Sequence, residues 1–175
     1  MVVRGFWRSI HSKTSMETGV NSSQLEPYSQ ALFDVVIEAV PVWMTRRIHE
    51  IVQMASSGDK DAVFARAPQI AQQTQDFVSE HLQQLLSQDV DAQRSNPLHI
   101  LRRSTSCATE VLRSAQIPPV HRDEFDTSAL PDDVYAIGPH TWCDLSEEVH
   151  EVGITWGAWK AATVIQRRRA EGKDI

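Results

Sequence analysis

The sequence predicts an all-α fold: a four- to five-helix bundle with a long ordered acidic loop between the last two helices. Apolar residues recur every three to four positions along most of the chain. No segment alternates with period two for long enough to indicate a strand. Residues that begin and end helices stand at the ends of the periodic segments.

The first predicted helix carries two apolar stripes and is interrupted by Pro41. One stripe begins at Tyr28. The other begins at Phe33 and continues past the proline through Met44, Ile48 and Ile51. This pattern predicts either one kinked helix or two helices that meet at Pro41. The segment ends at Ser57-Gly58, because glycine is the usual residue after a helix.

Two further helices are predicted before the long loop. Asp59 is a candidate cap for the second, whose apolar stripe runs from Val63 to Leu86 with Pro68 as its one interruption. The third begins after Ser95-Asn96-Pro97, where proline suits the first helical turn, and is predicted to continue without a break until Pro118-Pro119.

The last helix is predicted to start near Asp144-Leu145-Ser146, where Asp144 or Ser146 can act as the cap. Three arginines, Arg167 to Arg169, stand near its C-terminal end, where the helix dipole favours positively charged side chains. Gly157 lies between Trp156 and Trp159, and its small size predicts that another element approaches the helix closely at this point.

The N-terminal residues differ in composition from the rest of the chain. Arg4, Arg8 and Lys13 stand among apolar residues without an acid, and a stretch rich in Ser, Thr and Gly follows up to Gln24. We therefore expect residues 1–25 to be a disordered or extended tail, with Met16 as an alternative start. Residues 26–170 form the single predicted helical domain.

Composition excludes several classes of function. The formal net charge of −6 disfavours a nucleic-acid-binding surface, and no apolar stretch is long enough for stable membrane insertion. Arg4 and Arg8 interrupt the only leader-like segment, so secretion is not expected. Cys107 and Cys143 are far apart and match no disulfide framework. These observations predict a cytoplasmic protein without a cofactor.

About 28 residues, from Gln116 to Cys143, connect the third and last predicted helices, whereas bundle connections usually have two to eight. Nine acids stand against one base, Arg122, between Val120 and Glu151. The apolar residues of the connection predict that it packs onto the bundle. They are Ile117, Val120, Phe125, Leu130, Val134, Tyr135, Ile137 and Trp142.

The same connection suggests an alternative function as a small metal- or ligand-binding protein. His121, Asp123, His140 and Cys143 are residue types that bind zinc and similar cations. Their spacing matches no common four-ligand motif, so only their position in the folded chain can bring them to one point.

Several short motifs resemble an uncharacterised family of small α-helical proteins of actinobacteria, over about Tyr28 to Ala162. The motifs occur from the end of the second predicted helix into the last one. They are Asp89–Arg94, Pro97-Leu98, Thr109–Arg113, Ile117–Val120, Arg122–Phe125, Pro131–Tyr135 and Trp156–Ala161. The resemblance implies a helical architecture and a source taxon, but no activity and no site.

The sequence therefore favours a non-enzymatic protein-binding or regulatory module whose partner is unknown. The motif residues are expected either to hold the loop on the bundle or to form the binding surface. The candidate binding residues are Arg122, Asp123, Asp132, Asp133, Tyr135, Trp156 and Lys160. The two stripes of the first helix cover more than one of its faces, which suggests a homodimer through that helix.

Overall fold

A computed structural model of the chain describes residues 25–88, 96–123 and 130–173. These residues form an all-α bundle, as predicted, and no strand occurs among them. The predicted tail, residues 1–25, falls almost wholly outside the described residues, as does the motif Asp89–Arg94. In the described part of the chain, no helix has the length and apolar character needed to cross a membrane.

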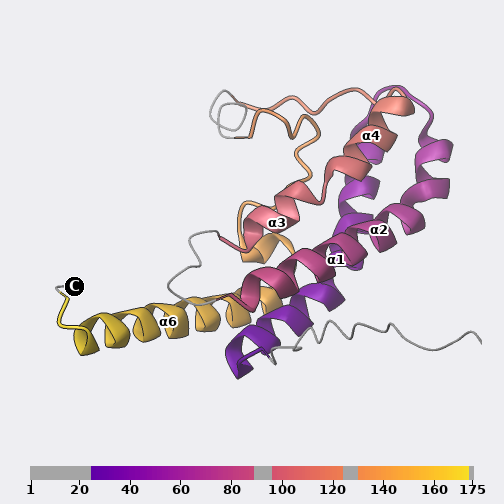
Figure 1. The fold of residues 1–175 in the computed structure, drawn as a ribbon. Coiled ribbons are helices and arrows are strands. Elements are labelled where there is room, and N and C mark those ends of the chain that lie inside the picture. Colours follow the sequence, from indigo (N-terminus) through magenta and orange to yellow (C-terminus); the bar gives the residue numbers. More distant parts are fainter. Residues whose placement is uncertain (1–24, 89–95, 124–129, 174–175) are drawn as a thin grey trace, which may run out of the picture.

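Helices α1 (Pro27–Met54) and α2 (Lys60–Leu86) lie side by side as a long hairpin (Figure 1). Helix α1 begins where the Glu26 side chain accepts hydrogen bonds from the amides of Tyr28 and Ser29. It runs through Pro41 as one helix, so the alternative of two helices that meet at Pro41 is wrong. Asp59 caps α2 through the amide of Ala62, also as predicted.

Gly58 makes the tight turn of this hairpin possible. Its φ of +101° is a conformation that side chains with a Cβ rarely adopt. A Cβ there would also come within 2.7 Å of Ile117 and 2.8 Å of the Gln116 carbonyl oxygen. The turn is tied to the end of α4 by a hydrogen bond from the Asp59 amide to the Ala115 carbonyl oxygen.

The third predicted helix is two helices, α3 (Leu98–Arg103) and α4 (Ser106–Ser114), so its predicted continuity is wrong. The break lies at Ser104 and Thr105. Their hydroxyl groups donate to the carbonyl oxygens of Leu101 and Arg102, at 2.7 and 2.8 Å. Such local bonds compete with the regular helical pattern, which explains the interruption.

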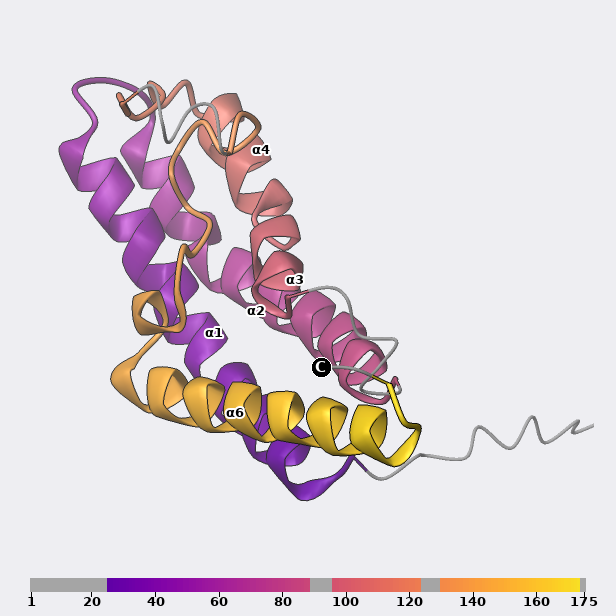
Figure 2. The same ribbon diagram turned by 90° about the vertical axis from the view of Figure 1, so that its left-hand side faces the viewer.

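Helix α6 (Glu147–Ala170) crosses the N-terminal half of α1, and Ser146 caps it by accepting from the Val149 amide (Figure 2). A short 3-10 helix, η1 (Trp142–Asp144), precedes it. A Cβ added at Gly157 would have no atom of another element within 4 Å, so the predicted close approach there is wrong. The close approach is at Gly153, where a Cβ would lie 2.6 Å from the Trp142 ring.

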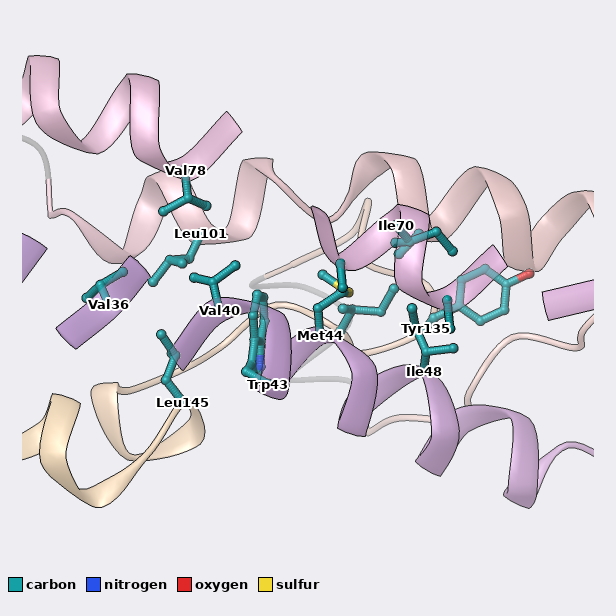
Figure 3. Packing of buried hydrophobic residues seen from close by; sticks show 14 of the residues in the cluster. Val36, Val40, Trp43, Met44, Ile48, Ile70, Val78, Leu101, Tyr135 and Leu145 are labelled. Atoms are coloured by element: carbon teal, nitrogen blue, oxygen red, sulfur yellow. The ribbon is translucent and has the colours of Figure 1, made fainter. Parts of the chain in front are cut away.

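One apolar core joins all these elements. It includes Trp43, Met44 and Ile48 of α1, Ile70 of α2, Leu101 of α3, and Tyr135 of the connection (Figure 3). Burying a large apolar side chain contributes about 1.5–3 kcal/mol, so these residues supply much of the stability. Both apolar stripes of α1 are used in this core, since α2 covers one side and α6 with the connection covers the other.

Candidate functional site

The connection between α4 and α6 returns along the bundle from the end of α4 to η1, between α1 and the α3–α4 pair (Figure 2). Its described parts, residues 115–123 and 130–141, contain no helix or strand. Ile117, Tyr135 and Ile137 are buried, whereas Val120, Val134 and Trp142 are half-buried. The described parts of the connection therefore pack against the bundle through these side chains. Phe125 lies outside them.

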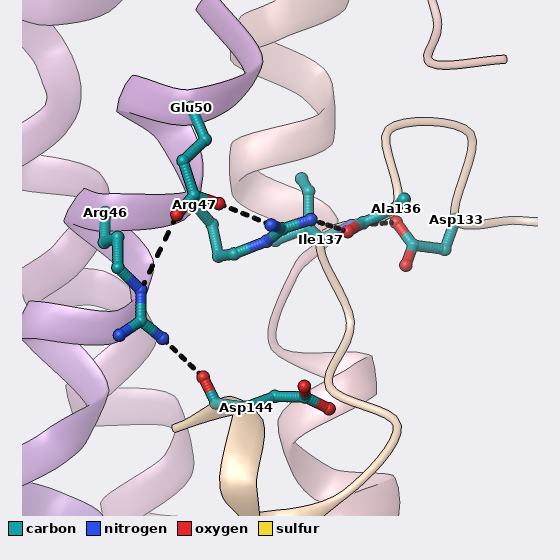
Figure 4. Close-up of polar contacts among 7 residues, drawn as sticks. All are labelled: Arg46, Arg47, Glu50, Asp133, Ala136, Ile137 and Asp144. Atoms are coloured by element: carbon teal, nitrogen blue, oxygen red, sulfur yellow. Dashed lines mark hydrogen bonds and ion pairs between the residues drawn. The ribbon is translucent and has the colours of Figure 1, made fainter. Parts of the chain in front are cut away.

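Three arginines from the helices donate to backbone carbonyl groups of the connection. Arg47 of α1 donates to Ala136 and Arg46 of α1 to Asp144, and both contact the Glu50 carboxylate (Figure 4). Arg102 of α3 donates to the carbonyl oxygens of Pro139 and His140, at 2.9 and 3.2 Å. Carbonyl groups in an irregular segment need donors from elsewhere, and these guanidinium groups supply them.

Two carboxylates hold turns within the connection. Asp133 accepts the amides of Ile137 and Gly138, at 2.8 and 2.7 Å. Asp144 accepts the amides of His140 and Thr141, at 2.7 and 2.8 Å. Each charged acceptor satisfies two backbone donors, which fixes the direction of the chain on either side of Pro139.

Tyr135 holds the connection from the inside. Its ring is buried, and its hydroxyl donates to the Ile117 carbonyl oxygen at 2.8 Å. Burial raises the pKa of this phenol above 10.0, and the charge of Arg113 offsets part of the effect. Tyr135 is therefore a packing residue, with little surface to offer a partner.

Trp156 and Lys160, also predicted as binding residues, take part in the contact between α6 and α1. The Trp156 ring is buried and its Nε1 donates to the Ser29 hydroxyl at 3.0 Å. The Lys160 ammonium lies 5.0 Å from the centre of that ring, and burial lowers the Lys160 pKa. Tyr28 of α1 stacks on Trp159 beside them.

The remaining predicted binding residues differ in their surroundings. Arg122 donates to the Leu130 carbonyl oxygen at 2.9 Å and so links the two described parts of the connection. Asp123 and Asp132 are exposed. Of the seven residues, Asp132 and Asp133 alone line a large cavity, which lies between the connection and the α3–α4 pair.

We call this cavity the arginine cleft. Its volume is about 730 Å³, in the range of ligand pockets in proteins. Helices α3 and α4 contribute guanidinium and hydroxyl groups, and the connection contributes two carboxylates at the opposite rim. The lining residues are His99, Arg102, Arg103, Thr105, Ser106, Thr109, Glu110, Arg113, Leu130, Pro131, Asp132 and Asp133.

The four candidate metal ligands do not form a cluster. His121 and Asp123 lie on the part of the connection that follows α4, whereas His140 and Cys143 lie near η1 and the α1 arginines. In residues 25–88, 96–123 and 130–173, no group of three or more His, Cys, Asp or Glu side chains is placed to hold a metal ion. The arrangement required by the metal-binding alternative is therefore not present there.

Sequence reasoning missed the arginines that matter most in this region, Arg46, Arg47, Arg102, Arg103 and Arg113. Each stands on an exposed or half-buried helix face, where a charged residue is ordinary. Comparison with known proteins adds no further assignment, because no protein-family model, curated protein or solved structure matches the chain.

Proposed function

We propose that the protein is a non-enzymatic protein-binding or regulatory module, and that the arginine cleft receives a segment of its partner. The observation that supports this proposal is the chemistry of the lining. Arg103 and Arg113 can donate to carboxylate and carbonyl oxygens, and Thr105, Ser106 and Thr109 add hydroxyl groups that both donate and accept.

The charges of the cleft favour a polypeptide over a compact polyanion. Glu110 and Asp132 stand in the same lining as the arginines, and they would repel a phosphate dianion. A peptide can place a carboxylate beside Arg103 and Arg113 and its amides beside the acids. We therefore propose that the partner is a protein that presents an extended segment with one or two acidic residues.

A cytoplasmic location is part of the proposal. Its support is that Cys107 and Cys143 are both free thiols in the described structure, as is usual in a reducing compartment.

Site-specific photocrosslinking in the source cells tests the cleft. A photoreactive phenylalanine analogue replaces Ser106, which lines the cleft, or Gln69, which is exposed on α2 outside it. We expect the Ser106 position to give one protein adduct that the Gln69 position does not give. Charge reversal by Arg103→Glu with Arg113→Glu should lower the yield of the Ser106 adduct at least about tenfold. Breaking a buried charge pair at an interface weakens binding by that factor or more.

Two results would contradict the proposed function. One is the same set of adducts from both positions, which indicates random collision. The other is a cleft adduct whose yield is unchanged by the double charge reversal while circular dichroism shows an intact fold.

A further inference from the structure

The side of α6 that faces away from α1 is apolar along its middle, unlike that of an ordinary surface helix. Trp156 is buried toward α1, whereas Ile154, Ala158 and Ala161 are exposed, and Ile165 is half-buried. These four residues follow one another at intervals of four, three and four positions, so they share one face of the helix, opposite Trp156. We call this patch the outer α6 face.

Acidic side chains stand at the beginning of the outer α6 face. Glu147, Glu148 and Glu151 are exposed in the first turns of α6, and Glu147 and Glu151 precede Ile154 at helical spacing. In the described part of the chain, no cation forms an ion pair with any of the three carboxylates. The last turn of the helix carries Arg167–Arg169 instead. A cationic apolar segment would therefore be attracted to the first half of this face and repelled from its end.

The first thirteen residues of the chain have the complementary composition. They contain three positive charges, on Arg4, Arg8 and Lys13, and no acid. Their apolar residues recur at intervals of three and four positions. These are Val3, Phe6, Trp7 and Ile10. Because Phe and Trp bring large apolar areas, this segment offers both kinds of contact that the outer α6 face can accept.

The described chain also begins beside α6. Leu25 packs on the core, and Tyr28 stacks on Trp159 of α6. Residues 14–24 join the first thirteen residues to this point, and such a length spans up to roughly 36 Å. Along the α6 axis, Glu147 is only about 18 Å from Trp159. The tether is therefore long enough, and it holds the segment near the face at an effective concentration on the order of millimolar.

We propose that residues 1–13 bind the outer α6 face of the same chain. Their apolar side chains cover Ile154 and the two alanines, whose small size lets an aromatic ring lie close to the helix. Arg4 and Arg8, which are four positions apart like Glu147 and Glu151, pair with those carboxylates. The arginine cleft lies on α3, α4 and the connection, so this inference does not depend on the proposed function.

Photocrosslinking from the segment itself tests the contact in the full-length protein. A photoreactive phenylalanine analogue replaces Phe6, and mass spectrometry of the digested protein locates the adducts. We expect most adducts to lie within residues 147–165 of the same molecule, with a yield that does not change on dilution. Adducts spread over all helices, adducts mainly on another element, or a covalent dimer whose yield falls on dilution would overturn the inference.

An apolar substitution in the outer α6 face tests the specificity of the contact. Ile154→Ser should lower the yield of the α6 adduct at least about threefold, because it removes exposed apolar area from the face. Val42→Ser, at a comparably exposed position of α1, should leave the yield unchanged. Equal losses in the two variants would overturn the inference. The position of the adduct in the chain without either substitution needs no intact variant.

A charge-neutralising pair tests the role of the carboxylates. Glu147→Gln with Glu151→Gln should lower the α6 adduct yield about threefold at low salt, where attraction between exposed charges is least screened. Asp76→Asn with Glu80→Gln removes two exposed acids at the same spacing on α2 and should have no effect. A yield that is the same in both pairs would contradict the proposed charge pairing.

Discussion

At the scale of single residues, Asp132 and Asp133 show that two identical neighbouring residues can have different structural roles. Asp133 accepts two backbone amides of the connection, whereas Asp132 is exposed at the rim of the arginine cleft. The sequence predicts that both can start a turn or bind a partner. The sequence cannot separate their roles, because the difference depends on where the backbone amides four and five residues after Asp133 lie in the folded chain.

Substitution of these two residues should have unequal effects on stability. We expect Asp133→Ala to lower the free energy of unfolding by about 2–3 kcal/mol, since two amides lose a charged acceptor. Asp132→Ala should change it by less than about 0.5 kcal/mol, as is typical of an exposed site. Urea denaturation of both variants measures the difference. Equal losses would show that Asp133 does not hold the connection.

At the scale of elements, the sequence predicts the long helices well and the irregular parts poorly. The apolar periods and the caps Asp59 and Ser146 are local signals, and the structure confirms both caps. The break at Ser104 was missed because a hydroxyl residue on a helix gives no sign that it will bond its own backbone. The anchoring role of Arg47 was missed because its acceptor lies 89 positions further along the chain.

Two glycines one turn apart in α6 provide a matched test of its contact with η1. A Cβ at Gly153 would lie 2.6 Å from the Trp142 ring, whereas a Cβ at Gly157 would meet nothing within 4 Å. We expect Gly153→Ala to destabilise the protein by about 1–3 kcal/mol, because the ring or the helix must move. Gly157→Ala should stabilise it by up to about 1 kcal/mol through helix propensity. Thermal unfolding by circular dichroism distinguishes these signs, and stabilisation by both substitutions would contradict the contact.

At the scale of the whole molecule, the distribution of exposed apolar residues bears on the predicted homodimer. That prediction rests on the two stripes of α1, and most residues of both stripes are covered within one chain. The exposed large apolar residues of the described structure are few and lie on two helices. They are Tyr28, Val42 and Met54 of α1 and Ile154 of α6.

We therefore expect a monomer in solution. Stable dimers usually bury a continuous apolar patch, and Val42 and Met54, each 68% exposed, stand twelve positions apart on α1. Size-exclusion chromatography with light scattering should give a mass near 19.7 kDa at micromolar concentration. A mass twice as large, reduced to the monomer value by Val42→Asp, would instead support the homodimer.

The pairing of α1 with α6 also has a consequence for how the chain folds during its synthesis. The Trp156 indole and the Ser29 hydroxyl that it contacts are 127 positions apart. Helices α1 and α2 therefore emerge from the ribosome long before α6 is made. During that interval, the side of α1 that α6 covers is exposed to solvent. A nascent chain of this protein should accordingly be a substrate for chaperones until its last helix emerges.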